Sequence, residues 1–138
     1  MSLMLQVVAI FVGGGLGALL RWAVSLQVAS DAGALPGLLG PIARGTLIAN
    51  LLGSFLLGLL AGGVAEQLSQ PLRQALMVGL LGGFTTFSSF SVETLQLLRM
   101  HGIYWASLQL TCHLAGGLSA ALLGLSLAEQ VVSAGSVS

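Results

Sequence analysis

The side chains able to do chemistry in this sequence are polar groups set singly into long apolar stretches. One series recurs every four residues, at Thr46, Asn50, Ser54, Gly58 and Gly62. On an ideal helix this spacing drifts by about 40° per step, so the series forms a stripe along one face. A stripe of this kind lines either a polar path or a tight helix contact, and spacing alone favours the contact. The Asn50 amide favours the path, because its donors and acceptor need a partner, a water or a passing ion.

A second series follows the same spacing at Gln109, His113 and Gly117. A lone histidine in an apolar helix more often bonds a carbonyl or a side chain than gates a path, so a functional His113 is the lesser alternative. Glu93 has two interpretations of equal weight. It is a functional acid inside an apolar stretch, or it is a structural acid that lies near the edge of that stretch or pairs with an arginine. For Arg21, we favour a side chain that reaches the lipid headgroups over one paired inside.

The most unusual stretch is residues 79–91, where glycines are followed by threonines, serines and the phenylalanines Phe84, Phe87 and Phe90. Glycines followed by β-branched residues are poor formers of continuous helix. An unwound backbone in lipid is tolerated only beside protein or water, so a break here indicates an ion or substrate site. The alternative is a glycine-softened helix packed against a neighbour. The rings are normally packing, although a ring edge carries partial positive charge and can face an anion.

The composition shows what must position these residues. Of 138 residues, 56% are hydrophobic and only 6% are charged, which is too few charges to cover a water-facing surface. We therefore expect an all-α integral membrane protein. Four basic and four acidic residues leave no basic patch for nucleic acid, and the single Cys112 leaves no disulfide framework and no zinc ligand set.

A helix needs about 20 apolar residues to cross the membrane, and the polar residues between apolar runs divide the chain into four such spans. The first is expected to be a retained helix rather than a signal peptide, and a loop is expected at 30–37. Pro71 is placed to start the third helix. The single membrane domain then has spans at about 3–28, 44–65, 72–99 with a break near 82–86, and 103–128, followed by a short polar tail at 129–138.

Four helices enclose little interior, so the polar groups in them predict that the protein forms oligomers. Small residues are spaced for close packing between subunits: Gly13 and Gly17 in the first span, Ser54, Gly58 and Gly62 in the second, Gly117 and Gly124 in the fourth. Arg44 and Arg99 lie on one side of the membrane and Arg73 on the other, which is a weak orienting bias. Insertion in both orientations, a dual topology, is compatible with this balance.

The sequence resembles the Fluc fluoride channels, also called CrcB-like proteins, over nearly its whole length. The resemblance rests on residues 13–22 (GGGLGALLRW), residues 45–53 (GTLIANLLG) and, most specifically, residues 79–91 (GLLGGFTTFSSFS) with Glu93. It implies an antiparallel homodimer of oppositely inserted subunits in the cell membrane, with two narrow fluoride pores that each draw on both chains.

The resemblance also assigns roles to single residues. Phe87 and Phe90 match ring edges that contact fluoride, and Asn50 matches a pore amide. The backbone carbonyls of Gly82 and Thr85 match the ligands of a central structural sodium ion (Na+). The residues expected along or near the path are Thr46, Thr86, Ser88 and Glu93.

The fourth span departs from the family pattern, which has a tyrosine and, four residues later, a serine along the pore. Alignment on residues 113–118 places Gln109 and His113 there instead. Both side chains can donate hydrogen bonds, and a pore-facing His113 predicts conduction that depends on pH, because imidazolium binds fluoride more tightly.

We therefore expect a passive, fluoride-selective channel that exports toxic fluoride and performs no enzyme chemistry. Neutral donors suit a small, strongly hydrated anion, since they replace its water without trapping it. The alternative is a small four-span proton-coupled exporter of organic cations, for which Glu93 is the only candidate acid within a span. A purely structural membrane subunit is a third possibility, and it leaves the break without a purpose.

Overall fold

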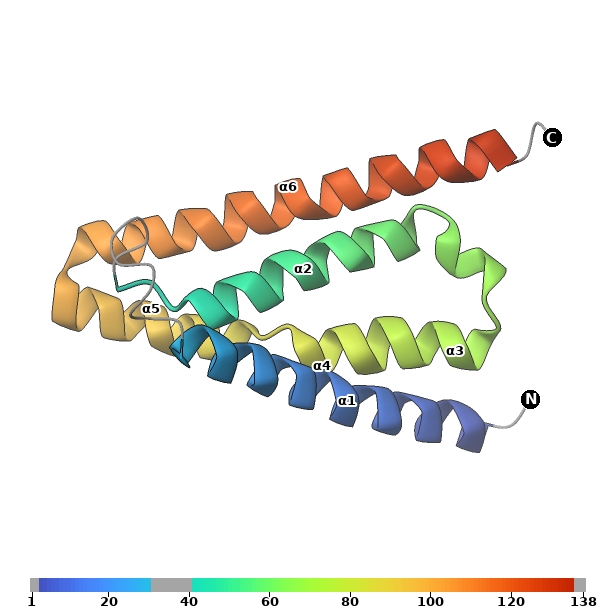
Figure 1. Ribbon diagram of the computed structural model, residues 1–138, viewed down its shortest axis with the longest axis horizontal. Helices are drawn as coiled ribbons and strands as arrows, with labels where there is room; N and C mark the ends of the chain where they lie inside the picture. Colours follow the sequence, from blue (N-terminus) through green and yellow to red (C-terminus); the bar gives the residue numbers. More distant parts are fainter. Residues whose placement is uncertain (1–2, 31–40, 136–138) are drawn as a thin grey trace.

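A computed structural model describes residues 3–30 and 41–135, and every regular element in these ranges is a helix (Figure 1). The long helices are α1 (Leu3–Ser30), α2 (Arg44–Ala61), α5 (Phe87–His101) and α6 (Ile103–Gly135). Four segments are long and apolar enough to cross a membrane: Leu3–Val28, Arg44–Ala61, Gln70–His101 and Ile103–Gly135. The prediction of an all-helical protein with four spans is confirmed. The loop predicted at 30–37 lies, beyond Ser30, outside the described residues.

The observed helix ends differ from the predicted ones. Helix α2 ends at Ala61 rather than near residue 65, because Gly63 takes a left-handed φ of 108° and turns the chain into the short 3-10 helix η2 (Val64–Gln67). Helix α6 continues to Gly135, so most of the predicted polar tail is helical. Its polar residues end the apolar run but not the helix, since residues such as Glu129 and Gln130 are good helix formers.

The third span is assembled from several short elements. It begins with α3 (Gln70–Gln74), continues as the π-helical segment η3 (Ala75–Leu81) and ends its first part with α4 (Gly82–Phe84). Thr85 and Thr86 then take extended backbone conformations, with ψ of 155° and 120°. Helix α5 starts directly afterwards, so two non-helical residues separate the two parts of this span (Figure 1).

Helix α1 lies along the third span with its glycines against the backbone of that span (Figure 1). A Cβ added at Gly13 would collide with the carbonyl oxygen of Ala75, and one added at Gly17 would collide with that of Leu80. Glycine is therefore required here by the close approach of two backbones.

Helices α2 and α6 pack together in the same way on the other side of the molecule. A Cβ at Gly58 would collide with the carbonyl of Ala121, and one at Gly124 with the carbonyl of Phe55. These small residues were expected to pack between subunits, and that expectation is corrected: their closest contacts lie inside one chain. Their spacing identifies a packing face but not the helix that packs on it.

The buried core is small and lies near the start of α2 and the turn between α5 and α6, where Ile42, Leu47, Leu97 and Ala106 cluster. Many large apolar side chains elsewhere are exposed; Phe11 is 81% exposed. An outward apolar surface of this extent matches a lipid surrounding, where helix association relies on close packing instead of hydrophobic burial.

Candidate functional site

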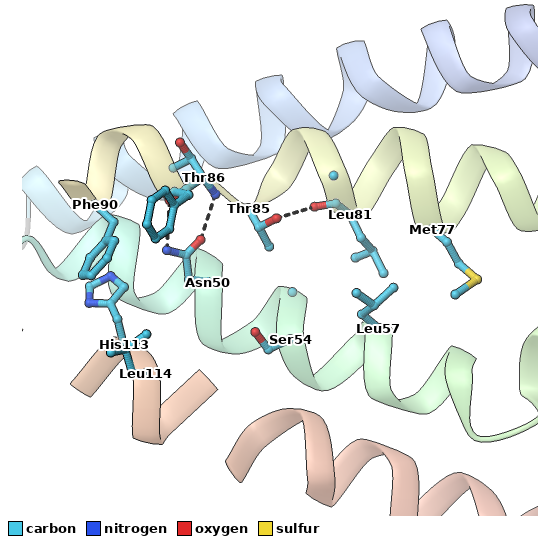
Figure 2. A pocket seen from close by; sticks show the side chains of 13 residues that line it. Asn50, Ser54, Leu57, Met77, Leu81, Thr85, Thr86, Phe90, His113 and Leu114 are labelled. Atoms are coloured by element: carbon cyan, nitrogen blue, oxygen red, sulfur yellow. Dashed lines mark hydrogen bonds between the residues drawn. The ribbon is translucent and has the colours of Figure 1, made fainter. Parts of the chain in front are cut away.

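A cavity of about 310 Å³ lies where the third span is interrupted, between α2, the third span and α6 (Figure 2). Its polar lining comes from all three: Asn50 and Ser54 on α2, Thr85 and Thr86 in the interruption, and His113 on α6. Apolar residues close the other end, including Leu57 and Met77 (Figure 2). The half of the predicted α2 stripe that carries Asn50 and Ser54 therefore faces a polar cavity. The glycine half forms the tight contact with α6, so each interpretation of the stripe holds for one part of it.

Asn50 is bonded to the interrupted backbone itself. Its Oδ1 accepts the N–H of Thr86 at 2.8 Å, and its Nδ2 donates to the Thr86 carbonyl at 3.2 Å (Figure 2). These two bonds satisfy both backbone groups of a residue that has left the helix. They use one of the two amide N–H groups of Asn50, which leaves a second donor for a ligand in the cavity.

The Thr86 side chain starts the next helix. Its hydroxyl oxygen accepts the N–H of Ser89 at 3.3 Å, which is an N-cap bond, and donates to the Ser89 hydroxyl at 3.2 Å. It also lies 3.1 Å from the hydroxyl oxygen of Ser88, which is exposed. Thr85 bonds back to the preceding helix, since its hydroxyl donates to the Leu81 carbonyl at 2.9 Å (Figure 2).

The two phenylalanines that line the cavity have different surroundings. Phe87 is 75% exposed, whereas Phe90 is 5% exposed. Their ring centroids lie 5.5 Å apart at an interplanar angle of 55°. Phe90 also stacks on the His113 ring, with centroids 4.5 Å apart and an angle of 35° (Figure 2).

The two α6 residues singled out in the sequence occupy different places. The His113 Nδ1 lies 3.0 Å from the Gln109 carbonyl oxygen, and the ring lines the cavity. The Gln109 side chain is fully buried; it accepts the N–H of Ala43 at 3.4 Å and donates to the Thr94 hydroxyl at 3.2 Å. Gln109 therefore ties α5 and α6 to the start of α2 and is not part of the cavity lining.

Thr46 and Glu93 form a second polar group one helical turn from Asn50 and Phe90. The Thr46 hydroxyl donates to the Glu93 Oε1 at 2.6 Å, and both residues line a smaller cavity of about 280 Å³. The structure thus divides the predicted site residues into two groups. The larger cavity has Asn50, Gly82, Thr85, Thr86, Phe87, Phe90 and His113, the smaller has Thr46 and Glu93, and neither lining includes Ser88 or Gln109.

The favoured prediction for Arg21, that its side chain reaches the lipid headgroups, is wrong. Its Nε donates to the Gly83 carbonyl at 3.3 Å, so it is paired inside with the end of α4. A signal was present in the sequence: Arg21 follows Gly17 by one turn and shares the face that the glycines press against the third span. The π-helical segment η3 had no comparable signal.

Four segments able to cross a membrane, three of which border a polar cavity, define a small multi-pass membrane protein. The sequence matches the family described as "CrcB-like protein, Camphor Resistance (CrcB)" over residues 8–125, and the chain belongs to this family.

Curated relatives resemble the chain over most of its length. The "Fluoride-specific ion channel FluC" of Pseudomonas aeruginosa (strain UCBPP-PA14) is 38% identical over 122 residues, which cover 87% of this chain and 91% of the relative. "Fluoride-specific ion channel FluC 1" of Yersinia pestis is 36% identical over 127 residues, 91% of this chain and 94% of the relative. A third relative, the "Fluoride-specific ion channel FluC" of Burkholderia cenocepacia (strain ATCC BAA-245 / DSM 16553 / LMG 16656 / NCTC 13227 / J2315 / CF5610), is 40% identical over 122 residues, which cover 87% of this chain and 90% of the relative.

Proposed function

We propose that this protein is a fluoride-selective channel of the cell membrane that lets toxic fluoride leave passively. The relatives are named as fluoride-specific ion channels, and the resemblance to them covers about nine-tenths of the chain: 87% for the first and 91% for the second. The observation that carries the proposal is the Asn50–Thr86 pair, which holds the third span open beside a cavity lined with neutral donors. The proposed activity needs no enzyme chemistry.

The cavity offers what a small, strongly hydrated anion requires. The second N–H of Asn50, the hydroxyl of Ser54 and the edges of the phenylalanine rings can replace water around fluoride. None of these groups carries a full charge, so fluoride can leave as readily as it enters. A narrow lining of this kind also excludes larger anions.

The functional unit we propose is an antiparallel homodimer with two pores. Thr85 and Thr86 lie midway along the segment Gln70–His101, which puts the interruption near the middle of the membrane. Phe87 lines the cavity yet is 75% exposed in the single chain, so a second subunit at this face would complete the lining. Thr46 and Glu93, one turn away, would continue the path from each cavity, with Ser88 near it.

A structural sodium ion fits the carbonyl groups of Gly82 and Thr85. In a continuous helix the Gly82 carbonyl would accept the N–H of Thr86, but that N–H donates to Asn50 instead. Thr85 is extended, and both residues line the cavity. Backbone carbonyls suit an alkali cation, and the ion would supply positive charge that holds facing carbonyls of two subunits together.

Fluoride efflux from liposomes carrying the purified protein tests the proposal. A potassium ionophore balances charge, and chloride efflux is measured in parallel. We expect rapid fluoride release without comparable chloride release. Monodisperse protein that releases no fluoride would overturn the channel, and release that requires an opposing proton gradient and an organic cation would favour the alternative exporter.

A further inference from the structure

One buried polar atom of a residue that lines the cavity lacks a partner. The Nε2 of His113 is buried and makes no hydrogen bond to any described residue, and the residue as a whole is only 8% exposed. A buried polar atom without a partner is costly, so such an atom beside a cavity indicates a ligand. In Figure 2 the ring extends from α6 toward Phe90.

The other ring nitrogen decides which proton the neutral ring carries. Nδ1 lies 3.0 Å from the Gln109 carbonyl oxygen, and a carbonyl oxygen can only accept. Nδ1 must therefore hold the proton in the neutral ring, which leaves a bare lone pair on Nε2. A second proton would convert Nε2 into an N–H donor with a positive charge.

The ring has little freedom to change this arrangement. One face stacks on Phe90 at a centroid distance of 4.5 Å, and Nδ1 is held by the backbone of its own helix. Nε2 lies on the edge of the imidazole farthest from α6. The same edge therefore repels an anion when the ring is neutral and binds one when the ring is protonated.

We propose that His113 is a proton-dependent selectivity residue: its protonated Nε2–H donates a hydrogen bond to the anion in the cavity, and its neutral ring withdraws that donor. The inference rests on the proposed function and assigns it a regulation. A serine or asparagine at this position would offer a donor at every pH, whereas this chain makes the donor conditional on acid.

Other charged groups on the neighbouring helices affect the same ring. Helices α2 and α5 pack against α6. Helix α2 begins with Arg44, and α5 carries Glu93 one turn after Phe90, with Arg99 and His101 in its last turn. The Glu93 carboxyl accepts the Thr46 hydroxyl and lines the neighbouring smaller cavity. Glu129 lies far along α6, more than four turns from His113.

The test measures fluoride efflux at low fluoride concentration at pH 6.0 and 8.0, with leak from protein-free liposomes subtracted. We expect wild-type efflux to be about tenfold faster at pH 6.0, the size expected for one charge-assisted hydrogen bond. His113→Ser should carry fluoride with a ratio near one. His101→Gln, which removes the histidine at the end of α5, is the matched control and should keep the wild-type ratio. Equal wild-type rates at both pH values, or a His113→Ser ratio like wild type, would overturn the inference.

A second readout separates this inference from the channel proposal. The ¹⁵N resonances of His113 are followed in the His101→Gln protein while sodium fluoride or sodium chloride is added. We expect the Nδ1–H tautomer at pH 8.0 and a fluoride-dependent shift of Nε2 at pH 6.0 that chloride does not cause. Absence of efflux with this shift present contradicts the channel only. Efflux without any pH dependence or Nε2 shift contradicts the role of His113 only.

Discussion

Against α1 the third span packs backbone to backbone, whereas against α2 and α6 it leaves a cavity lined by polar side chains. On the α1 side, Gly13 and Gly17 leave no room for a Cβ. On the opposite side, Asn50 reaches across and bonds to the backbone of Thr86. The same span is thus fixed by close contact on one side and opened by hydrogen bonding on the other.

This difference shows how an interrupted helix is held in place within a thin bundle. A rigid contact on one side fixes the position of the span, so the other side can give up helical hydrogen bonds without loosening. The glycines should therefore affect stability most, and the cavity residues should affect flux more than stability.

The largest effect is expected from Gly17→Ala, because the new methyl group would collide with the Leu80 carbonyl. Forcing the two backbones apart should cost about 3 kcal/mol of stability. Thermal unfolding in detergent, followed by tryptophan fluorescence, measures it. Gly15→Ala is the control, since nothing lies within 4 Å of a Cβ built there, and it should unfold like wild type. Equal stability of the two variants would show that the α1 side is not fixed by close contact.

Asn50→Ala comes next, because it leaves the N–H and carbonyl of Thr86 without partners. We expect a loss of about 2 kcal/mol in stability and a fall of about a hundredfold in fluoride efflux, since a cavity donor is lost as well. Ser54→Ala, which shortens another cavity residue, should be much milder. Wild-type efflux from an Asn50→Ala protein would show that conduction does not depend on the bonds between Asn50 and the interrupted third span.

The same substitution, phenylalanine to isoleucine, can be compared at the two phenylalanines that line the cavity. Phe90→Ile removes a buried ring that stacks on His113, so it should cost about 1.5 kcal/mol and lower efflux about tenfold. Phe87→Ile should lower efflux equally with a smaller loss of stability, because that ring is 75% exposed within its own chain. Size-exclusion chromatography checks that each assembly is intact. Unchanged efflux in both variants would reject the aromatic contact with fluoride.

The smallest effect is expected from Arg21→Gln, which removes a side-chain hydrogen bond between α1 and the third span. A loss of about 1 kcal/mol in stability and a change of less than about threefold in efflux are expected, because Arg21 bonds Gly83 at 3.3 Å from the side away from the cavity lining. Thermal unfolding and efflux on the same preparation measure both quantities. A greater loss of efflux than of stability would mean that Arg21 acts on the ion.

The sequence predicted the four spans because each is a long apolar run bounded by polar residues. It also singled out residues 79–91 of the third span, because glycines before β-branched residues are unusual in a helix. It could not predict which helix each glycine faces, so Gly58 and Gly62 were expected between subunits although they pack on α6 of the same chain. It could not distinguish Gln109 from His113 either, since four-residue spacing does not show which side chain a neighbouring helix covers.

The bond between Asn50 and Thr86 also has a consequence for biogenesis. A side-chain amide 36 residues earlier supplies what the peptide groups of a helix would otherwise supply to each other. In hydrocarbon, exposed peptide groups at Thr86 would be strongly disfavoured, so the third span can open only once α2 lies beside it. Because α2 is synthesised first, its asparagine is already present when the third span inserts, and the interruption can form as soon as the two segments pack together.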